Sequence, residues 1–188
     1  MSPPEDSTAA APRVCSDAPT RQEGDIMFGK FVIPSASVFY RSESSYAFVN
    51  LRPLVPGHVL VIPHQCQPHL ADLTDQAYTD LWMTVRLVQK VLQQQYPETT
   101  AFNVAVQDGR AAGQSVPHAH VHILPRTTGD YAVNDQIYTD LEEWAPRDEL
   151  RVVHAKMDVP DDAARRDRTR QEMADEAALY RNIVRELA

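Results

Sequence analysis

Three histidines stand on alternate residues of one short apolar run, and these residues are the best suited to chemistry in the chain. They are His118, His120 and His122, within residues 117–126. If the run is a β-strand, successive side chains point to opposite faces, so the three imidazoles share one face at spacings of about 6.6 Å. Near neutral pH an imidazole acts as a nucleophile, acid, base or metal ligand. The pattern therefore predicts either a metal site or nucleophilic catalysis.

The loop before these histidines is suited to binding phosphate. Gly109, Gly113 and Ser115 are small, and the backbone amides of such a loop can cradle an anion. A fourth histidine, His58, follows a Pro-Gly pair at the expected start of another strand. Each feature alone is common in proteins. Together with the alternating histidines, they favour phosphate chemistry.

Hydrophobic periodicity predicts the elements that position these residues. Thr74 is a suitable N-cap with Asp75 in the first turn, and the helix ends before Pro97. Its apolar stripe is Tyr78, Leu81, Val85, Val88 and Leu92. Short β-rich runs separated by turn signals occupy residues 28–33, 38–40, 46–50, 58–62, 102–106 and 118–124. This order predicts an α+β fold, an antiparallel sheet with a main helix packed on one face and a C-terminal helix.

The chain divides into four parts. Residues 1–25 combine several prolines with polar and charged residues, without periodicity, so we expect a disordered N-terminal extension. Residues 26–127 are the expected catalytic core, and residues 128–160 are expected to form a mobile polar loop. Residues 161–188 are predicted to form the C-terminal helix. Its apolar stripe is Met173, Ala177, Tyr180, Val184 and Leu187.

Composition limits the classes of partner and compartment. The formal charge of −8 and the pI near 5.3 argue against extended nucleic-acid binding and against membrane binding, because both need a basic surface. Cys15 and Cys66 match no zinc or redox spacing, so we expect a reducing compartment and no disulfide. No apolar run reaches the length of a membrane span, and the acidic first residues do not resemble a targeting peptide. These features predict a cytoplasmic protein, with the nucleus as a second location.

Residues 118–124 resemble a known family signature, in which histidine alternates with hydrophobic residues and two more hydrophobic residues follow. Further segments agree with the same family: 28–29, 47–50, 52–61, 107–109, 113–116, 124–126, 134–138 and 172–174. By these segments the chain resembles the histidine triad (HIT) superfamily of nucleotide hydrolases and transferases, and within it the fragile histidine triad (Fhit) branch, over roughly residues 27–184. One departure is Phe31, because the branch commonly has a histidine two residues after the Phe-Gly pair.

The resemblance implies the HIT fold and an enzyme similar to the bis(5′-adenosyl)-triphosphatases. Such an enzyme cleaves diadenosine triphosphate to AMP and ADP through a covalent nucleotidyl-histidine. The resemblance also implies Mg²⁺ or Mn²⁺ accompanying the polyphosphate, with no tightly bound cofactor and no protein-bound metal. Finally, it implies a two-fold homodimer formed through the main helix and an adjoining strand. Trp82 and Met83 lie beside the apolar stripe of that helix and give independent support for the dimer.

The resemblance further implies roles for individual residues. His120 corresponds to the nucleophile, and His122 would contact the phosphate and leaving-group oxygens. His118 and His58 would form a hydrogen-bond relay that fixes the neutral tautomer of His120, while Asn50 would bind a ribose hydroxyl. The phosphate oxygens would be held by Gln107, Gly113, Gln114, Ser115 and Val116. The apolar pocket for adenine would be lined by Phe28, Phe31, Ile33, Phe48 and Leu60.

Three alternatives stay open. The first is another HIT activity, a nucleoside phosphoramidase or a dinucleoside tetraphosphate phosphorylase. The second is a nucleotide-liganded signalling module, because Tyr138 lies among acidic residues where it could be phosphorylated, although it could equally be a helix-start residue. The third is a structural zinc protein, in which a coordinated imidazole nitrogen has no lone pair with which to attack.

Overall fold

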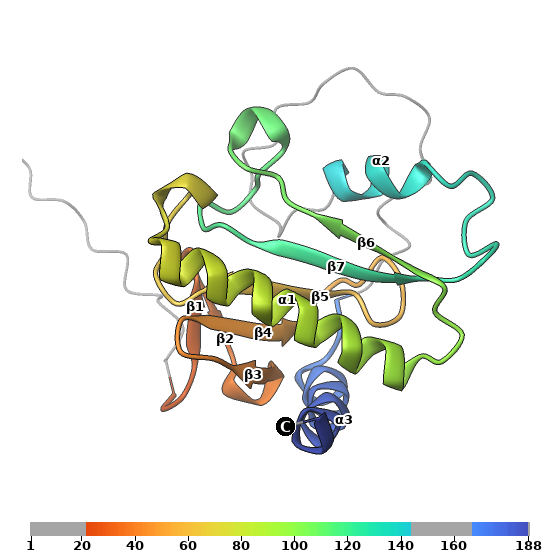
Figure 1. The fold of residues 1–188 in the computed structure, drawn as a ribbon, viewed down its shortest axis with the longest axis horizontal. Helices are drawn as coiled ribbons and strands as arrows, with labels where there is room; N and C mark the ends of the chain where they lie inside the picture. The colour runs from red at the N-terminus through yellow and green to blue at the C-terminus, as the bar shows by residue number, and fades with distance from the viewer. Residues whose placement is uncertain (1–21, 144–166, 188) are drawn as a thin grey trace, which may run out of the picture.

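The computed structural model describes residues 22–143 and 167–187 (Figure 1). Its strands are β1 Ile26–Phe28, β2 Phe31–Ile33, β3 Val38–Arg41, β4 Ser45–Val49, β5 Val59–Pro63, β6 Ala101–Ala105 and β7 Val121–Arg126. Its helices are α1 Asp75–Gln95, α2 Gln136–Glu143 and α3 Arg170–Leu187, with single 3₁₀ turns η1 Ser35–Ser37, η2 Leu70–Asp72 and η3 Arg110–Ala112. β1 and β2 form a hairpin, and the other strands form one antiparallel sheet in the order β3-β4-β5-β7-β6. The predicted α+β fold is confirmed.

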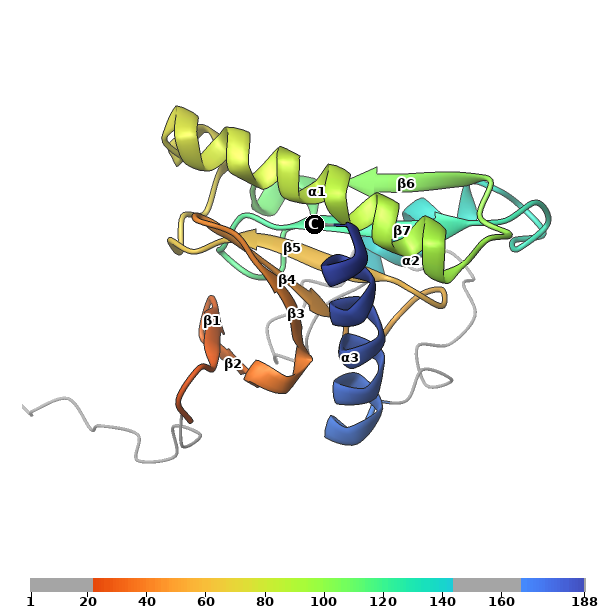
Figure 2. The ribbon, with the colours of Figure 1, turned by 60° about the horizontal axis from the view of Figure 1, so that its bottom comes forward.

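The two faces of the sheet have different coverings. α1 and α3 belong to one hydrophobic cluster with alternate residues of the two central strands. These alternate residues are Val59, Val61, Val121 and Ile123. The opposite face packs against the β1–β2 hairpin at Leu60 and against α2 at Leu124. Figure 2 shows α1 on one side of the sheet and the hairpin on the other. Because side chains alternate along a strand, His122 lies on the face opposite α1.

The main helix begins and ends where the sequence predicts. The Thr74 hydroxyl caps α1 by accepting from the Ala77 N–H at 3.2 Å, and the helix stops at Gln95, two residues before Pro97. Leu81, Val85, Val88 and Leu92 are buried, as predicted. Tyr78 is 43% exposed, so it does not belong to the buried stripe. Within the described residues, no helix has the length and hydropathy needed to cross a membrane.

The predicted strand 28–33 is instead a hairpin. Gly29 adopts a positive φ of 55°, which reverses the chain between β1 and β2 and is available to glycine at little cost. A Cβ at this position would come within 2.6 Å of Val116 Cγ1. The turn therefore lies directly against the loop that precedes the histidines.

The region after β7 differs from the prediction in two ways. α2 lies inside residues 128–160, which were expected to form a loop, and Ile137 and Leu141 bury it against the sheet. In α3 the predicted stripe holds through Met173, Ala177 and Tyr180, and Val184 packs partly buried against the same cluster. Ile183 is buried as well, whereas Leu187 is 41% exposed and lies outside the stripe. The predictions for residues 1–21 and 144–166 lie outside the described residues.

Candidate functional site

The fold brings the four predicted histidines together. Only His122 lies on β7, because His120 directly precedes the strand and His118 lies in a bend before it. His58 immediately precedes β5, and Leu60 of that strand pairs in register with His122. All four side chains are buried. The ring centroids of His120 and His122 lie 5.0 Å apart, and those of His58 and His122 lie 5.2 Å apart.

The orientation of His120 is fixed by a main-chain carbonyl. His120 Nδ1 lies 2.7 Å from the carbonyl oxygen of His118. A carbonyl oxygen can only accept, so Nδ1 carries the proton of the neutral imidazole. The lone pair therefore lies on Nε2. A histidine that attacks through Nε2 requires this tautomer.

The hydrogen bonds assign the opposite tautomer to His122. The N–H of Leu54 donates to His58 Nδ1 at 3.2 Å, so the proton of neutral His58 is on Nε2. That Nε2–H donates to His122 Nδ1 at 2.9 Å. The proton of neutral His122 is then on its own Nε2. His120 therefore offers a lone pair at Nε2, and the neighbouring His122 offers an N–H at its own Nε2.

The ring of His118 is held at both nitrogens. Its Nε2 donates to the Pro63 carbonyl oxygen at 2.9 Å, and its Nδ1 accepts from the Gly29 N–H at 3.2 Å. The expected relay between His118 and His58 is thus arranged differently. His118 orients His120 through its carbonyl oxygen, and His58 acts on His122. The side chain of His118 links the hairpin turn to the end of β5.

Burial keeps these imidazoles neutral. Burial lowers the pKa of His118, and the hydrogen bond to the Pro63 carbonyl, which raises the pKa, offsets only part of this effect. Burial also lowers the pKa of His120 to about 4, again against a carbonyl hydrogen bond. Burial first, and then the proximity of His58 and His120, hold the pKa of His122 well below its usual value. At neutral pH the imidazoles of His118, His120 and His122 are therefore neutral, and a neutral imidazole is required for attack.

Asn50 lies next to His58 at the end of β4. Its Oδ1 accepts from the Arg52 N–H at 3.1 Å, and its Nδ2 lies 3.3 Å from both ring nitrogens of His58. The side chain of Asn50 is buried. The predicted ribose-contacting residue is thus brought into contact with the histidine group.

The predicted phosphate loop lies between β6 and β7, and glycines shape it. Gly109 and Gly113 have positive φ values of 100° and 89°. A Cβ at Gly113 would come within 2.7 Å of Gln107 Nε2, so glycine is required beside this buried side chain. Gln107 Nε2 donates to the Leu141 carbonyl at 3.3 Å. This amide connects the loop to α2.

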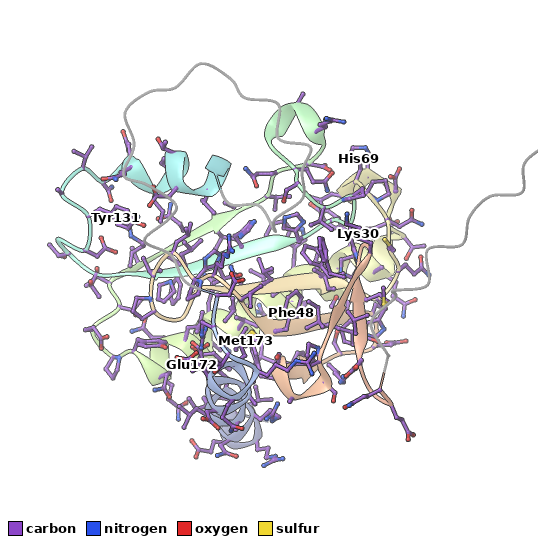
Figure 3. The ribbon with its side chains drawn as sticks, turned by 180° about the vertical axis from the view of Figure 1, so that it is seen from behind. Lys30, Phe48, His69, Tyr131, Glu172 and Met173 are labelled. Carbon is purple, nitrogen blue, oxygen red and sulfur yellow. The ribbon has the colours of Figure 1, made fainter. Side chains whose placement is uncertain are left out.

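The remaining members of the loop point in several directions. Gln114 Nε2 donates to the Pro68 carbonyl oxygen at 2.7 Å, so its side chain faces the segment before η2. Ser115 is exposed, whereas Val116 is buried in the cluster with the hairpin. Figure 3 shows Lys30 of the hairpin turn and His69 beside η2 toward one end of the molecule, with Tyr131 toward the other. His69 is also the residue nearest a Cβ built at Gly109, at 3.2 Å.

Residues 31–129, which contain all four histidines of the site, match the family model of the HIT domain. The chain belongs to the HIT domain family. It is 46% identical over 156 residues to the Arabidopsis thaliana bifunctional bis(5′-adenosyl)-triphosphatase/adenylylsulfatase FHIT, over 83% of this chain and 82% of that protein. It is 43% identical over 166 residues to an asymmetrical bis(5′-nucleosyl)-tetraphosphatase of Schizosaccharomyces pombe, over 81% of this chain and 90% of that protein. The crystal structure of the Caenorhabditis elegans NitFhit protein matches with a TM-score of 0.65 and 35% identity, over 87% of this chain and 31% of that one.

In this HIT domain, the residues predicted to line an adenine pocket form one cluster. Phe28, Phe48 and Leu60 are buried within it, and Figure 3 labels Phe48 in the interior. Phe31 and Ile33 are half-buried on β2. The rings of Phe28 and His120 meet edge to face, with centroids 5.1 Å apart. The apolar cluster is thus continuous with the histidines, and β2 supplies its accessible side.

Tyr138 of the HIT chain lies on the outer side of α2. Its side chain is 54% exposed, and its hydroxyl accepts from Asn103 Nδ2 at 3.4 Å. Ile137, the preceding residue, is buried. Tyr138 is therefore accessible at the surface, and its phosphorylation stays a prediction.

Sequence reasoning missed the backbone groups that orient the HIT histidines. They are the N–H groups of Gly29 and Leu54 and the carbonyl groups of Pro63 and His118. Every residue has such groups, so no residue type reports them. Only the Phe-Gly pair at residues 28–29, which contributed to the resemblance, pointed toward one of them.

Proposed function

We propose that the chain is a dinucleoside polyphosphate hydrolase that cleaves diadenosine triphosphate to AMP and ADP. The observation that carries this proposal is the opposite tautomers of two neighbouring imidazoles, His120 and His122. A lone pair beside an N–H donor suits attack on a phosphorus whose oxygens carry negative charge. The names of the relatives support the substrate class.

The reaction would proceed in two displacements at the α-phosphorus. His120 Nε2 forms a bond to phosphorus while the bond to the bridging oxygen breaks and ADP leaves. Water then breaks the phosphorus–nitrogen bond, which releases AMP and restores His120. His122, through its Nε2–H, stabilises charge on the phosphate and leaving-group oxygens. His120 is thus the nucleophile of the first step and the leaving group of the second, and one difficult transfer is divided into two easier ones.

The binding groups follow from their positions. The amides of residues 113–116, with Gln107, would hold phosphate oxygens, and Asn50 would hold a ribose hydroxyl. Phe31 would stack on adenine from β2, in place of the histidine that is common at this position. We propose that Mg²⁺ or Mn²⁺ arrives with the polyphosphate. Among residues 22–143 and 167–187, no three His, Cys, Asp or Glu side chains are grouped as metal ligands.

The test is turnover of a substrate panel by the purified protein. The panel contains diadenosine triphosphate, diadenosine tetraphosphate and an adenosine phosphoramidate, each with and without inorganic phosphate. We expect AMP and ADP from the triphosphate, without any need for phosphate. His120→Asn should abolish turnover and retain substrate binding, because it removes the nucleophile and keeps a similar shape. Near-normal hydrolysis by this variant would refute the mechanism.

A second substrate is favoured by one relative. The Schizosaccharomyces pombe protein, 43% identical, is named as a tetraphosphatase. The tetraphosphate arm of the panel tests this possibility. Cleavage of the tetraphosphate with a kcat/KM above that of the triphosphate would reassign the preferred substrate and leave the roles of the histidines unchanged.

We also propose that the protein is a homodimer in the cytoplasm. β6 is an edge strand of the sheet, and Val104 on it is 36% exposed. On α1, Met83 is 50% exposed beside the half-buried Trp82. These apolar groups suit an interface that covers α1 and extends the sheet at β6. Size-exclusion chromatography with light scattering should give twice the monomer mass, and a monomer would refute the dimer.

A further inference from the structure

The turn after β4, which carries Asn50, is held by a segment 118 positions later in the sequence. The main-chain N–H of Arg168 donates to the Leu51 carbonyl oxygen at 3.1 Å. Nη1 of the same arginine donates to the Asn50 carbonyl oxygen at 3.3 Å. Arg52, the next residue in the turn, forms an ion pair with Asp167. Three successive residues of the turn are thus joined to two successive residues before α3.

The guanidinium of Arg168 is itself anchored to α3. It forms an ion pair with Glu176, and these two side chains are only 17% and 13% exposed. Glu176 accepts from the Tyr180 hydroxyl at 2.7 Å, and that hydroxyl lies 3.0 Å from the hydroxyl of Tyr96. Tyr96 is the C-cap of α1. The arginine therefore connects both long helices to the turn, through a planar fork that lysine does not reproduce.

The start of α3 is fixed next to this arginine. Thr169 Oγ1 accepts from the Glu172 N–H at 3.2 Å, and the Glu172 carboxylate accepts from the Thr169 N–H at 2.7 Å. These reciprocal bonds form a capping box, which sets where the helix begins. Figure 3 labels Glu172 and Met173 at the first turn of α3. The capped end of α3 thus fixes the position from which the side chain of Arg168 extends to the turn.

A movement of the turn would reach the site through Asn50. Its side chain lies 3.3 Å from both ring nitrogens of His58. His58 in turn accepts from the Leu54 N–H and lies 2.9 Å from His122. Arg168 binds the main-chain carbonyl of Asn50, and Asn50 is the first residue after the hydrogen-bonded part of β4. The position of this carbonyl therefore affects the direction in which the Asn50 side chain points.

We propose that Arg168 is a positioning residue for the nucleotide site, which holds the main chain of Asn50 so that its side-chain amide meets the ribose of the substrate. This inference rests on the proposed function, because the ribose contact of Asn50 belongs to it. Arg168 acts through Asn50, and its loss changes how strongly the enzyme prefers a substrate with ribose hydroxyls.

The test compares Arg168→Lys with Arg181→Lys in the full chain. Arg181 lies on α3, beyond the segment that carries Arg168. It is a matched control, because its Nη1 also donates to main-chain carbonyl oxygens, those of Ala36 at 3.1 Å and Val38 at 2.9 Å. The measured quantity is the ratio of kcat/KM for diadenosine triphosphate to that for its 2′,3′-dideoxy analogue. We expect Arg168→Lys and Asn50→Ala each to lower this ratio about tenfold, the effect of losing one hydrogen bond. Arg181→Lys should keep the wild-type ratio.

A general loss of structure would lower both rates and leave their ratio unchanged. The inference is overturned if Asn50→Ala lowers the ratio and Arg168→Lys does not. If Arg168→Lys does not fold, Glu176→Gln replaces it, because this variant removes the charge that orients the guanidinium. We expect the same direction of change in the ratio.

Amide hydrogen exchange of the ligand-free protein separates this inference from the proposed function. Arg168→Lys should speed the exchange of the Arg52 and Leu54 amides about tenfold, because the Arg52 amide bonds to the side chain of Asn50 and the Leu54 amide bonds to His58, which Asn50 contacts. The amides of β5 should keep their wild-type protection. Unchanged exchange at these two amides would overturn the positioning role even if the wild-type protein shows no hydrolysis.

Discussion

The burial of His120 should lower the free energy of unfolding at acid pH, and a substitution at this position should remove its contribution. Its pKa is lowered from 6.5 to about 4 by burial. Between these values the unfolded chain binds more protons at this position than the native protein, so stability rises with pH there and is lost as pH falls. From pH 7 down to pH 4.5 this loss amounts to about 2 kcal/mol for His120 alone.

His120→Asn should reduce the acid-induced loss of stability by that amount. Asparagine does not titrate, and its amide can still donate to the carbonyl oxygen of His118, so the variant keeps a polar group in the same place. The measurement is the free energy of unfolding in urea at pH 7 and at pH 4.5. Ser115→Ala is the control, because Ser115 is exposed and does not titrate. An equal loss of stability in the wild type and in His120→Asn would refute the reasoning.

Three further results are expected. Gly29→Ala should destabilise the protein by about 2–3 kcal/mol in urea unfolding, because its φ of 55° is unfavourable for alanine and the new Cβ would lie 2.6 Å from Val116 Cγ1; a change below about 0.5 kcal/mol would contradict this. Thr74→Ala should cost about 1 kcal/mol in the same assay, because the Ala77 N–H loses its cap, and Thr74→Ser should restore most of it. The kcat of the proposed reaction should be level from pH 7 to about pH 5 and fall toward pH 4, because protonated His120 has no lone pair; a midpoint near pH 6.5 would contradict the effect of burial.

The parts of the fold that depend on local signals could be predicted from the sequence. α1 has an N-cap at Thr74, a proline after its end and apolar residues at helical spacing, all within a short stretch. The alternation along residues 118–124 correctly places Val121 and Ile123 toward the core and His122 on the other face. These signals depend only on neighbours in the chain, so no tertiary contact was needed to interpret them.

The parts that depend on distant contacts were not predictable from the sequence. The runs before β4 contain no signal that separates one strand from a hairpin except Gly29, whose N–H bonds to His118 Nδ1, 89 positions later. Likewise, His58 follows a turn signal, but nothing nearby predicts that its ring bonds to His122 rather than to His118. The tautomers follow from four backbone groups, and backbone groups have no signature in the residue types.

The alternation of side chains along β5 and β7 also bears on protein engineering. The aliphatic residues of these strands that pack against α1 lie on one face of the sheet, and His122 lies on the other. Mutations that repack the α1 side can therefore raise thermal tolerance without touching a residue of the site, and sequences can diverge there under selection for packing alone. The histidine residues tolerate less change, because the rings of His58, His118 and His122 bond to groups of other segments and the ring of His120 bonds to the carbonyl oxygen of His118.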